Sequence, residues 1–297
     1  MSTTSVFRIL PILGLAASPA FAAKSERPQP TLKYESVYAG NTQLEANSVN
    51  VGEVAVTRHI ASLNVPLKQL SSSTFPSFGL EYSGFYLDKS GDVPLSDELQ
   101  SLSASLGVLQ KLNERWTLIS SVSPGLHNAG SSFSTKGFGF GVFALANYKV
   151  SETLTLGAGF VYDSLSESIP LMPIVGARWN FANGWEFTLA FPSTRVTYAA
   201  SSKLKLRASL DLDVGSFHVE NDPGTGAASQ PSLRDTVLDY TAISTGIGAD
   251  YVLTDDLTLS ATLGYNFSRT ANYDERDYEI EAKDGAPTAR LGLTYTF

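Results

Sequence analysis

The side chains best suited to acid–base chemistry are three histidines, His59, His127 and His218. A histidine that contacts a serine and an acid can form the triad of a hydrolase or an acyltransferase. The sequence offers these partners near His127: Ser121, Ser123 and Asp163. Serine is abundant in this chain, however, so a serine close to a histidine is expected by chance. We therefore expect no catalytic residue and no enzymatic activity.

Residues 270–285 concentrate carboxylates, the ligands that Ca²⁺ prefers. The acidic side chains are Asp274, Glu275, Asp277, Glu279, Glu281 and Asp284. The segment lacks the spacing and the turn glycine of an EF-hand loop, and Arg276 and Lys283 partly neutralise it. We interpret it as a solvated loop whose carboxylates divalent ions could bridge to lipopolysaccharide phosphates, with a weak divalent-ion site as the alternative.

The composition excludes several other classes of site. None of the 297 residues is cysteine, which excludes disulfide scaffolds, thiol nucleophiles and thiolate-bound zinc. Twenty-one basic against 29 acidic residues give a net charge of −8, which argues against a nucleic-acid partner. No nucleotide, haem or metal motif is present, so we predict no cofactor and no metal.

The N-terminus has the features of a secretory signal peptide over residues 1–22. Arg8 supplies the positive charge, residues 9–17 the apolar core, and Ala20-Phe21-Ala22 the cleavage site. The apolar run is about half of the ~20 residues that a transmembrane helix needs, so an uncleaved anchor is the lesser alternative. We expect cleavage after Ala22, a disordered lead-in over 23–31 and one domain over 32–297.

That domain shows strict alternation of apolar and polar residues, which is typical of β-strands with one buried face. The clearest strands are 138–148, 154–162, 204–214, 257–268 and 289–297. Their apolar faces carry no charged residue, and their other faces consist of Gly, Ser, Thr, Asn and charged residues.

Two folds fit this alternation, a soluble β-sandwich and a membrane β-barrel, and we favour the barrel. The strands run for 9–12 residues, near the ~9–11 that cross a bilayer at a tilt, whereas strands of globular proteins average ~5–6. Aromatic residues suited to a membrane–water interface lie near the ends of the apolar stripes: Trp116, Tyr148, Tyr162, Trp179, Trp185, Tyr251, Tyr265 and Tyr295.

Short turns and long loops alternate along the chain, as they do in bacterial barrels. Placing the C-terminus in the periplasm puts the short turns there and the long loops outside. The pattern predicts an all-β, up-and-down antiparallel transmembrane barrel of 12–14 strands. Fourteen are expected at 32–40, 51–64, 77–87, 98–111, 115–127, 137–150, 154–164, 171–181, 185–191, 195–200, 204–218, 236–253, 257–269 and 286–297. The number falls to twelve if the 185–200 hairpin does not span.

The inward faces of the expected strands carry charges of both signs. The candidates for a lumen or constriction are Arg178, Glu186, Arg195, Lys205, Arg207, Asp211, Asp213, Asp250 and Arg290, with Glu81, Lys149 and Asp163 on the far wall. By the same parity, His218 faces the lipid. The charges could form a salt-bridged plug in a closed barrel, or they could line a wet channel and set the field on passing ions.

The ending Leu291-x-Leu293-x-Tyr295-x-Phe297 resembles the signal by which the barrel assembly machinery recognises outer-membrane barrels. Together with the signal peptide, it points to the outer membrane of a Gram-negative bacterium. The segment from Trp185 through 191–198 to the 204–218 strand, with the closing hairpins, resembles an uncharacterised family of outer-membrane β-barrel proteins. That resemblance implies the fold and no established activity.

The first functional expectation is a passive, porin-like channel for small solutes through the mixed-charge lumen. The alternative is a closed structural or surface-interaction barrel that acts through its acidic extracellular loops. A lipid hydrolase at the rim is the minor alternative. The partners expected in each case are outer-membrane lipid and lipopolysaccharide.

Overall fold

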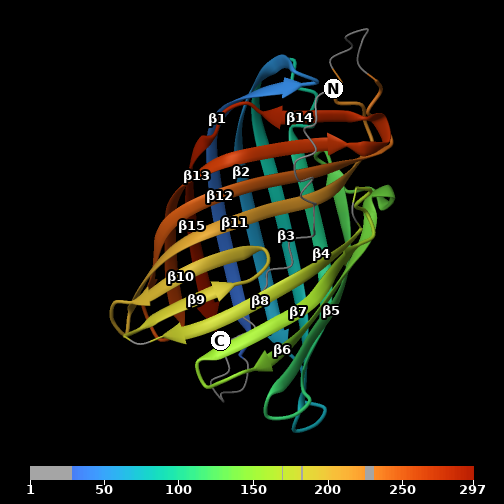
Figure 1. Ribbon diagram of the computed structural model, residues 1–297. Coiled ribbons are helices and arrows are strands. Elements are labelled where there is room, and N and C mark those ends of the chain that lie inside the picture. The colour runs from blue at the N-terminus through green and yellow to red at the C-terminus, as the bar shows by residue number, and fades with distance from the viewer. Residues whose placement is uncertain (1–28, 169, 182, 225–230) are drawn as a thin grey trace, which may run out of the picture.

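The computed structural model describes residues 29–168, 170–181, 183–224 and 231–297. The expected signal peptide and most of the expected lead-in therefore lie outside the described residues. The described chain is all-β and forms a closed antiparallel barrel of fourteen strands, with one additional short strand, β14, at one end (Figure 1). The prediction of a β-barrel near the upper strand count is confirmed.

The strands follow one another around the barrel in chain order, as hydrogen-bonded neighbours. Their bounds are β1 Thr31–Ala46, β2 Val49–Pro66, β3 Thr74–Gly91, β4 Glu98–Lys111, β5 Trp116–Ala129, β6 Phe138–Lys149, β7 Leu154–Asp163, β8 Leu171–Phe181, β9 Trp185–Leu189, β10 Ser193–Ala199, β11 Leu204–Val219, β12 Thr236–Val252, β13 Leu257–Tyr273, β14 Tyr278–Ala282 and β15 Ala286–Thr296. Two short 3₁₀ turns are η1 Thr135–Gly137 and η2 Asp274–Arg276. No helix of the described residues is long and apolar enough to cross a bilayer.

The barrel closes between its first and last strands. Tyr34 of β1 pairs with Ala61 of β2 on one side and with Leu293 of β15 on the other. We call the end that holds the C-terminus and the short strand connections the turn end, and the opposite end, with the β1–β2 hairpin and β14, the loop end (Figure 1).

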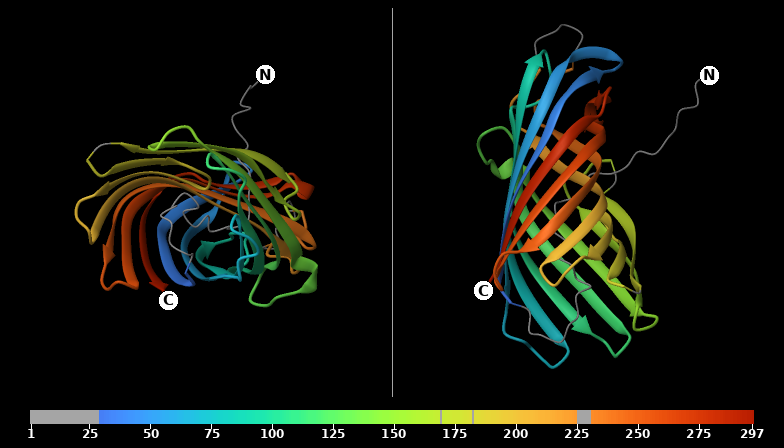
Figure 2. Two further views of the ribbon diagram at one scale, coloured as in Figure 1. Left: turned by 90° about the horizontal axis from the view of Figure 1, so that it is seen from below. Right: turned by 90° about the vertical axis from the view of Figure 1, so that its left-hand side faces the viewer.

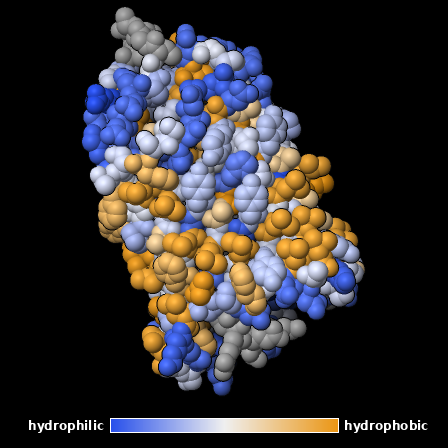
Figure 3. Space-filling view, turned by 180° about the vertical axis from the view of Figure 1, so that it is seen from behind, coloured by the Kyte–Doolittle hydropathy of each residue, from blue (hydrophilic) through white to orange (hydrophobic). Residues whose placement is uncertain are grey.

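The outward face of the strands is apolar. Ile247 and Leu263, which are paired on adjacent strands, are 72% and 69% exposed. Figure 3 shows hydrophobic residues gathered over the lower part of the molecule and hydrophilic ones over the upper part. Aromatic rings pair at the turn end, with centroids 4.8 Å apart for Trp116 and Tyr148 and 4.9 Å apart for Tyr295 and Phe297. An apolar belt bordered by aromatic residues is the surface that a lipid bilayer covers.

The wall of the barrel is doubled beside β11. Strands β9 and β10 are short, so β11 pairs with β10 only up to Asp211. The rest of β11 bends inward and pairs in parallel with the end of β5, at His218 and Val219. Strands β6–β8 cover its outer side, where Val214 packs with Leu145, Val161 and Ile174. Figure 2 (left) shows this second layer over the orange strands.

This arrangement corrects the expectation that His218 faces lipid. The side chain of His218 is 12% exposed, and its Nε2 lies 3.9 Å from Oδ1 of Asp235. The cause is the bend of β11, which turns the outward side of its last residues toward another layer of the protein. Parity along one strand does not reveal such a layer.

An apolar core fills the loop end. Residues of β1–β5 and β11–β14 meet there with three residues from loops, Val93, Leu95 and Leu233, which are each at most 5% exposed. The hydroxyl of Tyr273 donates a hydrogen bond of 3.0 Å to the carbonyl oxygen of Pro94. Segments 92–97 and 231–235 therefore fold into the mouth of the barrel.

The interpretation of 270–285 as a wholly solvated loop is corrected as well. Strand β13 continues to Tyr273, and β14 pairs with both β13 and β1. Tyr273, Tyr278 and Ile280 are buried in the apolar core, whereas Glu279 and Glu281, on the other face of β14, are exposed. The alternation of 278–281 places apolar and acidic residues on opposite faces of a hairpin.

The charged lumen and its cavity

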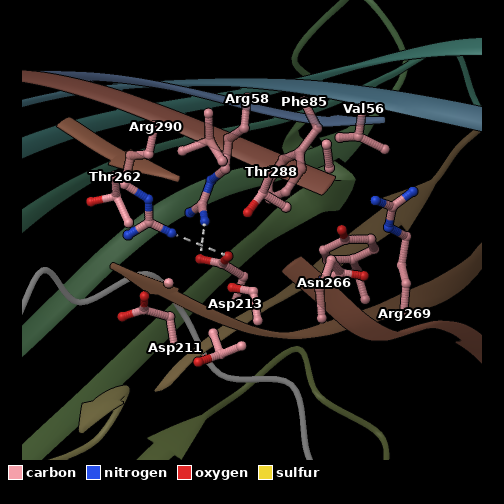
Figure 4. A pocket seen from close by; sticks show the side chains of 17 residues that line it. Val56, Arg58, Phe85, Asp211, Asp213, Thr262, Asn266, Arg269, Thr288 and Arg290 are labelled. Atoms are coloured by element: carbon pink, nitrogen blue, oxygen red, sulfur yellow. Dashed lines mark hydrogen bonds and ion pairs between the residues drawn. The ribbon is translucent and has the colours of Figure 1, made fainter. Parts of the chain in front are cut away.

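An ion-pair network centred on Asp213 of β11 crosses the middle of the lumen. Arg58 of β2 donates from Nη1 to Asp213 Oδ1 at 2.9 Å, and Arg290 Nη2 of β15 lies 3.7 Å from Asp213 Oδ2. Arg290 Nε is also 3.5 Å from Oε1 of Glu35 on β1. Figure 4 shows the two guanidinium groups converging on the one carboxylate. The network joins four strands across the barrel.

Aromatic rings cover this network toward the loop end. The guanidinium of Arg58 lies 4.5 Å from the ring centroid of Phe85, and its Nε donates to Ser83 Oγ at 2.9 Å. The Phe85 ring packs edge-on against Phe217, at 5.8 Å, and Tyr240, at 5.1 Å. A cation that contacts both a carboxylate and an aromatic face is held firmly in one position.

A cavity of about 40 Å³ adjoins the network. At roughly 10–15 Å³ for each water, this volume holds about three water molecules. Asp211, Asp213, Arg58, Arg290 and Arg269 supply its charged lining. Arg269 is 5% exposed, and its Nε, Nη1 and Nη2 have no hydrogen-bond partner among the described residues.

The other expected lumen residues fall into ion pairs and side-chain hydrogen bonds toward the turn end. Arg178 Nη2 lies 2.6 Å from Glu186 Oε2 on the neighbouring strand. Arg207 pairs with Asp250 and donates from Nη2 to Thr262 Oγ1 at 2.7 Å. Asp211 Oδ1 accepts a hydrogen bond of 2.6 Å from Ser193 Oγ, to which Arg195 donates at 3.1 Å. Lys205 is exposed at the turn end.

The far-wall charges lie apart from the cavity beside Arg269. Asp163 Oδ2 accepts from Ser216 Oγ at 3.2 Å, and its Oδ1 accepts from the Leu165 amide at 2.9 Å. Lys149 pairs with Glu152 at 2.7 Å. Glu81 lines a second, smaller cavity of about 20 Å³ on the other side of Arg58.

No hydrogen bond within the described part of the chain joins a histidine to a serine and an acid. His127 is buried, and its Nε2 has no partner there. Ser123 Oγ likewise has none, and Asp163 is engaged by Ser216 instead. His59 lies on the outer face, where its ring stacks on Tyr34 and Nδ1 is 2.9 Å from the Tyr34 hydroxyl.

Carboxylates from three segments meet outside the apolar belt, at the loop end. Burial, together with the nearby charges of Glu275, Asp239 and Asp274, raises the pKa of Glu167 to about 7. Asp274 and Glu275 thus interact with the 164–168 segment, whereas Asp277, Glu279 and Glu281 are exposed. Among the described residues, no three His, Asp or Glu side chains are placed to hold a metal ion.

Three residues of the lumen site escaped sequence reasoning: Glu35, Arg58 and Arg269. The first two lie on the inward face of β1 and β2, and extending the alternation argument to 32–64 would have found them. Alternation along the strand predicts the wrong face for Arg269, because a β-bulge precedes it. Ile243 pairs with Ser268 while Ser244 pairs with Asn266, so Phe267 is the extra residue and the facing of later residues is reversed.

The comparisons with known proteins agree with this geometry. The model of a protein family described as a domain of unknown function, DUF6268, matches residues 33–292. The chain belongs to this family. None of the curated proteins matches it in sequence. The expected likeness to an uncharacterised outer-membrane barrel family is thereby confirmed.

Solved structures of outer-membrane barrels are similar to this chain. The COG4313 outer membrane channel from Pseudomonas putida F1 aligns with a TM-score of 0.53 at 13% identity, over 92% of this chain and 97% of that one. The NanC porin aligns with a TM-score of 0.41 at 14% identity, over 90% and 100% of the two chains. At 13% identity, the likeness to the COG4313 channel shows a common fold.

Proposed function

We propose that the protein is a passive channel of the outer membrane for small polar solutes, closed in this conformation. The ion-pair network around Asp213 carries the proposal. An apolar core of similar volume would close a barrel at least as stably as buried ion pairs do. Charges that keep partial access to water can instead exchange their partners for water and ions, as the lining of a pore must.

Two further features support a channel. Fourteen strands enclose more space than the eight that side chains just fill. The fold is also that of a protein described as an outer membrane channel. Because bacterial barrels have short periplasmic turns and long extracellular loops, the turn end would face the periplasm and the loop end the outside. Outer-membrane lipid and lipopolysaccharide would surround the belt, and the barrel assembly machinery would insert a chain cleaved after Ala22.

Single-channel conductance of the refolded mature chain, residues 23–297, tests the proposal. We expect brief, small current steps from the wild type. Asp213→Ala removes the carboxylate that ties Arg58 to Arg290, so we expect longer and larger steps with a shift toward anion selectivity. Glu152→Gln, on an exposed turn, serves as the control. If neither the wild type nor Asp213→Ala gives any current, although both are shown to be β-rich and inserted in the bilayer, the channel is refuted.

One observation favours a second function, a closed barrel that acts through its surface. Loop residues Val93, Leu95 and Leu233 seal the mouth as part of an apolar core. In that case the exposed carboxylates around 274–281 would form the binding surface, and divalent ions would bridge them to lipopolysaccharide. Replacing 274–277 by Gly and Ser would then weaken Ca²⁺-dependent binding to lipopolysaccharide vesicles without affecting conductance. The expectation of no enzymatic activity stays a prediction.

A further inference from the structure

The guanidinium of Arg269 is a buried charge that forms no ion pair with an acidic side chain of the described residues. Its neighbours in the cavity, Arg58 and Arg290, both contact Asp213, and Arg290 also reaches Glu35. Figure 4 shows Arg269 apart from this network, with no interaction drawn to it. The hydroxyl of the buried Tyr240 lies close enough to interact with it. A phenol hydroxyl does not neutralise a guanidinium.

An arginine cannot avoid the cost of a buried charge by losing its proton. A buried lysine becomes neutral when desolvation is severe, but a guanidinium remains charged at every physiological pH. An isolated ion away from water is costly unless an opposite charge or several acceptors satisfy it. The bulge at Phe267 nevertheless turns Arg269 inward, next to a cavity. The lining of this cavity carries three arginines, Arg58, Arg269 and Arg290, against two carboxylates, Asp211 and Asp213, so one positive charge has no counterpart among the lining residues.

We propose that Arg269 forms an anion-binding site in the lumen and that its ligands are short-chain monocarboxylates. A planar carboxylate matches the fork of the guanidinium, which can donate two parallel hydrogen bonds to it. Tyr240 lines the same cavity and interacts with Arg269, and a phenol hydroxyl can donate a further hydrogen bond to a carboxylate. The inference deepens the proposed function, because it names a class of solute, and its relevance to transport rests on that function.

The shape and the lining of the cavity select this class. Its volume of about 40 Å³ admits a carboxylate group that carries one or two further carbons, as in acetate or propionate. Val56, Phe85 and Ala242 give it an apolar wall for a short alkyl group, and Thr288 and Asn266 give it polar edges. With Asp211 and Asp213 also facing the cavity, the net charge of its lining is +1, which one monocarboxylate neutralises and which a dianion such as sulfate exceeds.

Binding is tested on the refolded mature barrel in detergent micelles, with sodium acetate as the probe. Acetate is titrated against sodium chloride at constant ionic strength, and both calorimetric binding and the thermal midpoint are followed. We expect saturable binding to the wild type, at least tenfold weaker binding to Arg269→Met, and a severalfold loss in Tyr240→Phe. Propionate is expected to bind comparably and sulfate poorly. Arg276→Met, which removes an exposed guanidinium at the loop end, is expected to bind like the wild type.

Either of two results overturns the inference: no effect of acetate beyond that of chloride on the wild type, or equal binding by Arg269→Met. The first needs no variant, so a folding failure of Arg269→Met would not protect the inference. Arg269→Lys provides a second variant, which retains the charge and loses the fork, and it is expected to bind more weakly than the wild type. Because these measurements do not use current, a barrel that binds acetate but does not conduct would refute the channel alone.

Discussion

The contribution of a carboxylate to stability depends on how far its ion pair is buried, as Asp213 and Glu152 show. Asp213 accepts from Arg58 and lies beside Arg290, and its side chain is 27% exposed while that of Arg58 is 10% exposed. The acid therefore compensates two guanidinium groups that water reaches poorly. Glu152 pairs with Lys149 on a turn and is 89% exposed, so the same kind of contact has little value there.

The first prediction concerns Asp213→Asn. The amide keeps the shape but leaves two guanidinium groups without their shared charge, so we expect the free energy of unfolding to fall by about 2 kcal/mol. Urea unfolding of the barrel in lipid vesicles measures this. Glu152→Gln should change the free energy by less than about 0.5 kcal/mol. Equal effects of the two substitutions would show that the network does not hold the lumen.

The second prediction concerns pH. The pKa of Glu167 in the folded chain is about 7, above the usual value of a glutamate in an unfolded chain, because of burial and the neighbouring acids. The folded state therefore binds the extra proton, and stability falls as the pH rises from about 4.5 to 7. Glu167→Gln should flatten this fall by about 1 kcal/mol, after allowance for the exposure of the group.

Thermal unfolding at pH 5 and pH 7.5 measures the effect, and Glu114→Gln, in a short turn, should leave the slope unchanged. An unchanged slope in Glu167→Gln would show that the carboxylates at the loop end do not share a proton.

At the scale of elements, the bulge in β13 and the short β9–β10 hairpin shape the interior. The bulge lets Phe267 face outward while Arg269, Ala271 and Tyr273 face inward, although a regular strand would place all four on one face. The short hairpin frees the end of β11 to bend and pair with β5. Both features arise from local register, and both change which residues line the lumen.

The third prediction uses the bulge. Deleting Phe267 removes the residue without a pairing partner, so the ladder becomes regular and every later residue keeps its face. Deleting Leu263, on the same strand and also outward, removes a paired residue and reverses the facing on one side of the gap. We expect the Phe267 deletion to fold and the Leu263 deletion not to. Heat-modifiable mobility on gels distinguishes the two, and a folded Leu263 deletion would contradict the assigned register.

At the scale of the whole molecule, the barrel is apolar outside and closed inside at two levels. The outward belt carries large exposed hydrophobic residues on most of the strands, which suits lipid. The apolar core closes the loop end, and the charged network closes the middle. In the proposed channel, opening would have to change both levels, so a substitution at either level alone would give a partial response.

The fourth prediction concerns the belt. Leu263→Arg places a charge near the middle of the lipid-facing surface and should cost about 2–4 kcal/mol in vesicles. Val49→Arg, at a residue that is 64% exposed in the hairpin at the loop end, should cost at most about 1 kcal/mol. Similar costs for both would argue against a bilayer at this height of the barrel.

The sequence by itself determined the elements and their facing. Alternation along 138–148, 154–162, 204–214, 257–268 and 289–297 predicts strands, and the long apolar stripes predict lipid contact. The alternation of short and long connections predicts an up-and-down barrel whose short turns all lie on one side, together with the C-terminus. These properties are local or periodic, so a single strand carries the signal. For the same reason the inward facing of Asp213, Arg207 and Arg290 could be predicted, since each lies on a regular stretch.

Only the tertiary structure decided which charges meet and where the lumen closes. The pairing of Asp213 with Arg58 joins residues 155 positions apart across the barrel. The facing of Arg269 depends on a bulge that pairing with β12 defines, and the burial of His218 depends on a second layer supplied by β6–β8. Alternation predicts which residues of a strand share a face. It predicts neither the register between strands nor the residues across the barrel, and the ion pairs of the lumen depend on both.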